Sequence, residues 1–244
     1  MNKLYKKNEI GFSIFWIVIY VVLFSLADNI SRSIGIEKII TLIVGILITT
    51  ILVVWMKKNN LLEKYGLCKS EISSKRLLYY IPLIIISLTN LCFGVTINHS
   101  LLEISIFIGT MFLVGFLEEI IFRGFLFTAM SKDNVKVAII VSSITFGMGH
   151  IINLINGSGM NLFSNLLQVE YAIAIGFLFT IMFYKTKSLW PCIITHGVTN
   201  SLAIFVNKEM LTQTDEVVIA IIWTVISIFY TIYIIKQTRA KNSK

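Results

Sequence analysis

The first apolar run of the chain reads IGFSIFWIVIYVVLFSLA over residues 10–27, without one charged side chain. Of all 244 residues, 56% are hydrophobic and only 14% are charged, and the mean hydropathy is +0.83. A soluble domain usually carries about 25% charged residues, so this chain has too little polar surface to cover its apolar residues in water. These values indicate an integral membrane protein.

Eight apolar runs approach the length of about 20 residues that a helix needs to cross a hydrocarbon core, and the sixth is the shortest. The runs are continuous and do not alternate apolar with polar residues, which favours helices over barrel strands. We therefore expect an all-α membrane protein, a polytopic bundle of about eight transmembrane helices, with residues 1–244 forming a single membrane domain. The expected spans are residues 10–27, 36–56, 77–97, 104–128, 135–155, 170–184, 188–206 and 216–235.

The basic residues predict how these spans are oriented. If the N-terminus is cytoplasmic, all but three of the 21 Lys and Arg residues fall in cytoplasmic segments, and the exceptions are Arg32, Lys38 and Lys208. This count places Arg123 in a cytoplasmic loop. Because Lys and Arg favour cytoplasmic loops, we expect a multi-pass protein with both termini in the cytoplasm. The net charge of +8 then reflects topology, and no nucleic-acid partner is expected.

Two segments admit more than one interpretation. The basic N-terminus and first run resemble a signal peptide with a passable cleavage site at residues 25–27, but the run exceeds the usual 7–15 apolar residues, which favours a retained helix. The loop over residues 57–76 either lies on the anionic inner leaflet or is an ordinary cytoplasmic loop. Cys68, Cys92 and Cys192 are odd in number and widely spaced, so no disulfide framework or zinc knuckle is expected. We interpret Cys192 as a packing residue rather than a nucleophile.

Three expected spans, the fourth, fifth and seventh, carry ionisable or amide side chains. A charge at the bilayer centre costs about 2.5–3.5 kcal/mol on insertion scales, so it needs a reason. Glu119 and Arg123 lie four residues apart and can pair on one helix face, whereas Glu118 points about 100° away and is expected to have different partners. A single intramembrane His or Asn usually joins two helices, but a set this dense indicates a functional site. The set is Glu118, Glu119, Arg123, His150, His196 and Asn200.

These side chains can activate water and stabilise an oxyanion. We expect Glu118 to transfer the proton, with Glu119 and Arg123 as its structural support. The sequence has no HExxH motif of the soluble metalloprotease type. Glu118, His150 and His196 can nevertheless supply three ligands to a divalent metal such as zinc and leave one position open. The sequence therefore leaves both a metal-dependent and a metal-free mechanism open.

Three motifs carry a resemblance to a known family. They are EExxxR at residues 118–123, FxxxH at 146–150 and HxxxN at 196–200, in this order on membrane helices. Together they resemble the CPBP family, the CAAX-protease and bacteriocin-processing intramembrane proteases, also called Abi proteins. The resemblance covers about residues 107–203, within a motif-bearing core of about 104–206.

The resemblance implies a polar intramembrane cavity that reaches the cytoplasmic leaflet. It also implies hydrolysis of a membrane-associated peptide or protein by a glutamate- or metallo-type protease. In this family's pattern, Glu118 activates water with the help of His150, and the oxyanion is stabilised by His196 and Asn200. The short basic loops suit a bacterial cell membrane, where relatives are linked with bacteriocin immunity and peptide maturation.

Two functions without proteolysis remain as alternatives. One is a non-catalytic immunity or peptide-binding membrane protein. The other is a proton-coupled transporter that uses the same carboxylates and imidazoles as a proton relay. The complete set of motifs favours the enzyme, and transporters tend to show inverted repeats, of which the sequence gives no sign.

Overall fold

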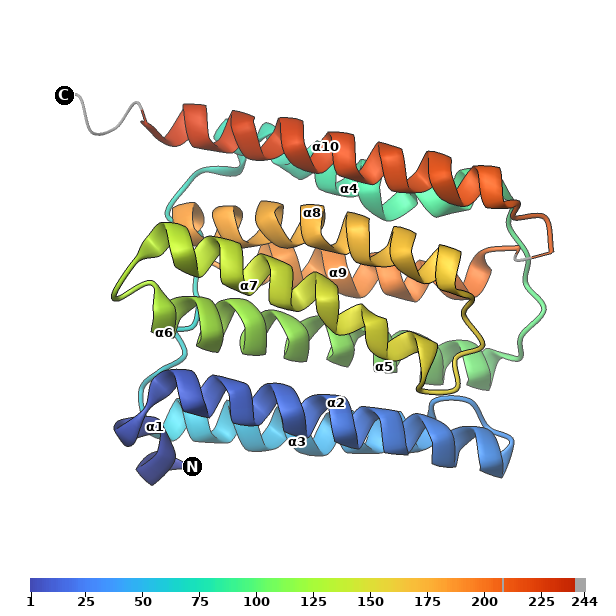
Figure 1. Ribbon diagram of the computed structural model, residues 1–244, viewed down its shortest axis with the longest axis horizontal. Helices are drawn as coiled ribbons and strands as arrows, with labels where there is room; N and C mark the ends of the chain where they lie inside the picture. The colour runs from blue at the N-terminus through green and yellow to red at the C-terminus, as the bar shows by residue number, and fades with distance from the viewer. Residues whose placement is uncertain (208, 240–244) are drawn as a thin grey trace.

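The computed structural model describes residues 1–207 and 209–239. Its long helices lie side by side along one axis (Figure 1). Helices α2 and α3 form one edge of the bundle, α4 and α10 form the opposite edge, and the remaining long helices lie between them (Figure 1). In chain order the elements are α1 (Asn2–Lys7), α2 (Glu9–Ile34), α3 (Ile39–Lys58), η1 (Ser74–Tyr80), α4 (Ile81–Leu88), η2 (Thr89–Phe93), α5 (Leu101–Glu118), η3 (Glu119–Phe127), α6 (Thr128–Met130), α7 (Val135–Gly149), η4 (His150–Leu154), α8 (Leu162–Thr186), α9 (Trp190–Leu202), η5 (Ala203–Phe205) and α10 (Gln213–Arg239).

Seven helical segments within the described residues are long and apolar enough to cross a membrane, which confirms an all-α multi-pass membrane protein. The sixth expected span is longer than its apolar run, because α8 begins at Leu162 and not near residue 170. Its first turns carry polar side chains that form hydrogen bonds inside the protein. Asn165 is fully buried and donates to His150 O at 2.9 Å, and Gln168 accepts from Asn153 at 2.9 Å. The seven segments are Glu9–Ile34, Ile39–Lys58, Ser74–Phe93, Leu101–Met130, Val135–Leu154, Leu162–Thr186 and Gln213–Thr238.

The expected seventh span, residues 188–206, differs most from the sequence-based expectation. Helix α9 has only 13 residues, and η5 extends it to Phe205, which falls short of the roughly 20 residues of a complete span. A loop covers its first turn, where Leu189 N donates to Gly66 O at 2.8 Å. Because α9 packs against α5 and α4 inside the bundle, protein rather than lipid surrounds much of its length.

Helix α1 and the last turn of α10 lie at the same end of the bundle, called here the end of the termini (Figure 1). Residues 59–73 fold onto this end of the bundle and contribute side chains to its core. Tyr65 is only 2% exposed, and its ring lies 4.8 Å from that of Phe125. Leu61 and Leu67 pack on the same core. Neither interpretation of this loop predicted that its side chains pack against the core at this end of the bundle.

One assignment in the count of basic residues was wrong. Arg123 does not lie in a cytoplasmic loop, because its side chain is completely buried within η3. The residue therefore says nothing about orientation and belongs to the interior of the protein. Lys208, Lys241 and Lys244, which the count also used, lie outside the described residues.

Candidate active site

The first motif lies where an α-helix changes into a π-helix. Glu118 is the last residue of α5, and Glu119 begins the π-helix η3. Turns of this kind are rare and occur frequently at functional sites. Arg123 Nη1 donates to Glu119 Oε1 at 3.0 Å, and both side chains are fully buried. The pairing inferred from their spacing is therefore present in the structure.

Aromatic rings surround the buried Arg123 side chain. Its Cζ atom lies 3.9 Å from the ring centroid of Phe146 and 5.7 Å from that of Phe179. A ring face attracts a cation, so these rings compensate part of the lost hydration. Arg123 Nε and Nη2 and Glu119 Oε2 have no hydrogen-bond partner among the described residues. The ion pair is therefore held by one hydrogen bond, two rings and one further neighbour, His196.

His196 joins the two glutamates. Its Nδ1 atom lies 2.9 Å from Glu119 Oε1, and its Nε2 atom lies 3.6 Å from Glu118 Oε2. As expected, the two carboxylates do not share one set of hydrogen-bond partners, although this one imidazole presents a nitrogen to each. A proton on Nδ1 is donated to Glu119, which fixes the ring and directs Nε2 toward Glu118. The side chain of His196 is 9% exposed.

Two glycines bring α9 this close to α5. A Cβ atom placed on Gly115 would lie 2.8 Å from the backbone nitrogen of Gly197 and 3.3 Å from the carbonyl carbon of His196. Only glycine permits such contact between two helix backbones. The glycine before Glu118 and the glycine after His196 therefore set the distance between the two motifs.

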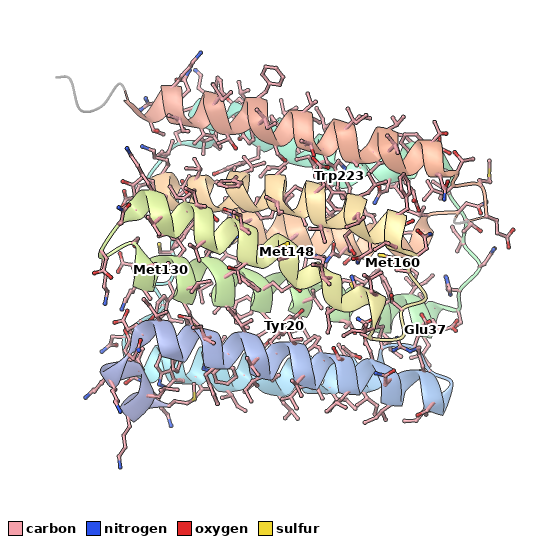
Figure 2. The ribbon with its side chains drawn as sticks, viewed as in Figure 1. Tyr20, Glu37, Met130, Met148, Met160 and Trp223 are labelled. Carbon is pink, nitrogen blue, oxygen red and sulfur yellow. The ribbon has the colours of Figure 1, made fainter. Side chains whose placement is uncertain are left out.

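Glu118 has a partner that the motifs did not reveal. The hydroxyl of Tyr20 on α2 donates to Glu118 Oε1 at 2.6 Å. Tyr20 lies about midway along α2, on the side that faces the central helices (Figure 2). Glu118 Oε2 is buried and accepts no hydrogen bond. A tyrosine within an apolar run is ordinarily a packing residue, so the sequence alone carried no signal for this contact.

His150 and Asn200 complete the set from two further helices. His150 caps the C-terminal end of α7, its Nδ1 atom lies 3.2 Å from Phe146 O, and its carbonyl accepts from Asn165. The sequence reasoning also missed Asn165, a fully buried side chain that fixes the start of η4. Asn200 is half-buried on α9, four residues after His196. The described structure thus gathers all six expected site residues in the interior of the bundle.

Two cavities meet at these residues. The first, of about 240 Å³, contains Glu118 and Tyr20, and the second, of about 200 Å³, contains His196. Both cavities are lined by His150 and Asn200. The two side chains therefore stand between the carboxylate and the second cavity, where a peptide bond and a water molecule can approach from different sides.

The first cavity extends to the end of the bundle that is remote from the termini. Its lining includes Asp28, Lys38 and Asn156, and Lys38 follows Glu37, which marks that end in Figure 2. Asp28 and Lys38 form an ion pair of 2.7 Å beside the cavity. If the termini are cytoplasmic, this cavity extends toward the opposite leaflet, whereas the resemblance implies a cavity that reaches the cytoplasmic leaflet. The orientation and the direction of access both stay predictions.

The three metal-ligand candidates do not form a ligand group in this arrangement. Across residues 1–207 and 209–239, no three His, Cys, Asp or Glu side chains are placed to hold one metal ion. His196 Nδ1 faces Glu119, His150 Nδ1 faces a backbone carbonyl, and Glu118 Oε1 accepts from a tyrosine. Each of these contacts occupies one donor atom of its side chain and leaves the other, so a metal held by these three residues stays a prediction of the sequence.

Cys192 is the remaining side chain considered from the sequence. It is fully buried, and its Sγ atom lies 3.6 Å from Phe179 O. It lines neither of the two cavities. This placement agrees with its interpretation as a packing residue.

Comparisons with known proteins agree with the motifs. Residues 100–202 match a family model described as type II CAAX prenyl endopeptidase Rce1-like. The Bacillus subtilis (strain 168) protein "Putative membrane peptidase YdiL" is 31% identical over 94 residues, which are 38% of this chain and 33% of that protein. The chain thus matches about a third of the length of this curated relative. The matched segment contains all six site residues and both glycines of the α5–α9 contact. Residues 100–202 are thus similar to the Rce1-like type II CAAX prenyl endopeptidases, which confirms the resemblance carried by the three motifs.

Proposed function

We propose that this protein is an intramembrane endopeptidase in which Glu118 activates a water molecule that hydrolyses a membrane-associated peptide or protein. One observation carries the proposal. Glu118 presents a buried oxygen, Oε2, that accepts no hydrogen bond, beside a cavity and 3.6 Å from His196 Nε2. A buried carboxylate oxygen without a partner is costly, and a proton acceptor for water is a function that justifies it.

The first half of the reaction uses the two cavities. Water enters the first cavity, whose walls carry polar side chains, and donates a hydrogen bond to Glu118 Oε2. Glu118 takes a proton as the water oxygen attacks the carbonyl carbon of the peptide. The negative charge moves to the carbonyl oxygen, where the Asn200 amide lines the second cavity and can donate a hydrogen bond; His196 lines the same cavity and can donate from Nε2 when both of its nitrogens carry protons. His150 lies between the two cavities and orients the water.

The second half restores the enzyme. The tetrahedral intermediate collapses, the bond between carbon and nitrogen breaks, and Glu118 returns its proton to the leaving amine. The products are a new carboxyl terminus and a new amino terminus. Glu119 and Arg123 are buried behind His196 and do not line either cavity, which suits a role in holding the imidazole. The family match and the resemblance to a named membrane peptidase support hydrolysis over transport.

The substrate class proposed here is a peptide or protein held at the lipid bilayer, because the site lies inside a helical bundle with seven membrane-crossing segments. Peptide maturation and bacteriocin immunity are the processes that the resemblance implies. We further propose, from the path of the first cavity, that water reaches Glu118 from the end of the bundle remote from the termini.

The test compares peptides in membranes and medium of cells carrying wild type, Glu118→Gln or Glu103→Gln by mass spectrometry. Glu103 lies on the same helix, is exposed, and forms a capping box with Ser100 that glutamine also satisfies. A peptide that accumulates uncut only with Glu118→Gln supports the proposal and supplies the substrate. Identical peptide profiles in all three strains contradict it and favour the non-catalytic function.

A further inference from the structure

We infer that Tyr20 is a positioning residue that orients the general base Glu118, an inference that rests on the function proposed above. Tyr20 lies on α2, far outside the matched segment 100–202, yet its hydroxyl reaches Glu118 Oε1 at 2.6 Å. A hydrogen bond of this length to a carboxylate is of the short, charge-assisted kind. The active site therefore extends to a helix that carries none of the three motifs.

The contact gives the two carboxylate oxygens different tasks. The last torsion of a glutamate side chain is broad, so an unattached carboxylate samples many orientations. Tyr20 holds Oε1, and this leaves Oε2 as the oxygen without a partner, 3.6 Å from His196 Nε2. Water that binds Oε2 is then placed beside the imidazole. Without the hydroxyl, either oxygen can turn toward the cavity or toward α2.

The position of Tyr20 is itself fixed by packing. Its side chain is buried, and its ring lies 4.4 Å from that of Phe24, one turn further along α2. It lines the first cavity together with Glu118. Because packing already fixes the Tyr20 ring, its hydroxyl keeps one position during the reaction and holds the Glu118 carboxylate in one orientation.

A purely structural role for Tyr20 predicts a different result and needs a matched control. Tyr230 on α10 is also buried, and its hydroxyl donates to Leu77 O at the same distance, 2.6 Å. It lines neither active-site cavity. Tyr20→Phe and Tyr230→Phe therefore each remove one buried hydrogen bond of the same length and keep the ring, and only the first touches the base.

The experiment measures kcat and KM of the purified full-length variants on the peptide that accumulates in membranes carrying Glu118→Gln. We expect Tyr20→Phe to lower kcat by about 10- to 100-fold with KM within about twofold of wild type, because a lost charge-assisted hydrogen bond misplaces the base without altering peptide binding. Tyr230→Phe should retain the wild-type kcat. Both variants should remain folded, with a lower melting temperature than wild type.

Three results overturn the inference. They are a wild-type kcat for Tyr20→Phe, an increase in KM with kcat unchanged, and an equal loss of kcat in both tyrosine variants. These results leave the proposed function intact if Glu118→Gln is inactive. If Glu118→Gln itself cleaves the peptide, or if no peptide accumulates, the proposed function fails as well. The two failures are thus distinguishable by the behaviour of Glu118→Gln.

Discussion

Replacing Gly115 by alanine tests whether the close contact between α5 and α9 holds the site together. A Cβ on residue 115 would lie 2.8 Å from the backbone nitrogen of Gly197 and 3.1 Å from its Cα atom. Both are backbone atoms and cannot rotate away. Ordinary contact begins at 3.4 Å, so α9 must move away from α5 by about 0.6 Å to relieve the 2.8 Å contact.

The same displacement acts on the hydrogen bond between the two helices. The distance from His196 Nδ1 to Glu119 Oε1 rises from 2.9 Å to about 3.5 Å, where a hydrogen bond is no longer formed. Since a misplacement of 1 Å at a catalytic group costs about 100-fold in rate, we expect Gly115→Ala to lower kcat at least about tenfold. Overpacking should also lower the free energy of unfolding by about 1–3 kcal/mol.

The assay is cleavage of the accumulated peptide by purified variants, with thermal unfolding measured in the same detergent. Gly109→Ala is the control, because it makes the same change on the same helix and its Cβ meets only a side-chain atom, Leu42 Cδ1, at 3.3 Å. Gly109→Ala should keep wild-type activity. Wild-type cleavage by Gly115→Ala, or equal losses in both variants, would refute the role given to the α5–α9 contact.

Two further predictions concern the buried charges and the topology. Glu119→Ala and Arg123→Ala should each lower membrane abundance and melting temperature, because either change strands a fully buried charge at a cost of about 3–5 kcal/mol; unchanged abundance and melting of both variants would contradict a structural ion pair. In a variant without native cysteines, Asn156→Cys and Lys7→Cys should be labelled by a membrane-impermeant maleimide from opposite sides of the membrane, since the first lines the cavity at the far end and the second lies beside the N-terminus. Labelling of both from one side would contradict the path assigned to the first cavity.

Much of the fold could be predicted from the sequence because lipid imposes a simple requirement on length and polarity. The uncharged runs on α2 and α3 satisfy it, and both helices form where the runs predicted them. The same requirement fails for α9, whose apolar run continues through residues that the structure places outside the helix. A helix that is surrounded by protein does not have to be as long as the bilayer is thick. Hydropathy cannot distinguish such a helix from one that faces lipid.

In the site, contacts within one helix could be predicted from residue spacing, whereas contacts between helices could not. Spacing predicted the pair of Glu119 and Arg123, because both residues lie on one helix. It could not predict that His196 contacts both glutamates, since this depends on the distance that two glycines set between helices. The contact of Tyr20 could not be predicted for the same reason, because its partner, Glu118, lies 98 residues away in the chain.

The central claim is that Glu118 delivers water to a peptide bond, and hydrolysis in H₂¹⁸O tests it most directly. Purified wild type, Glu118→Gln and Glu103→Gln are incubated with the accumulated peptide, and the products are analysed by mass spectrometry. We predict that wild type and Glu103→Gln place one ¹⁸O atom in the new carboxyl terminus and that Glu118→Gln yields no product. Cleavage by Glu118→Gln at the wild-type rate, or a wild-type product without ¹⁸O, would contradict the account.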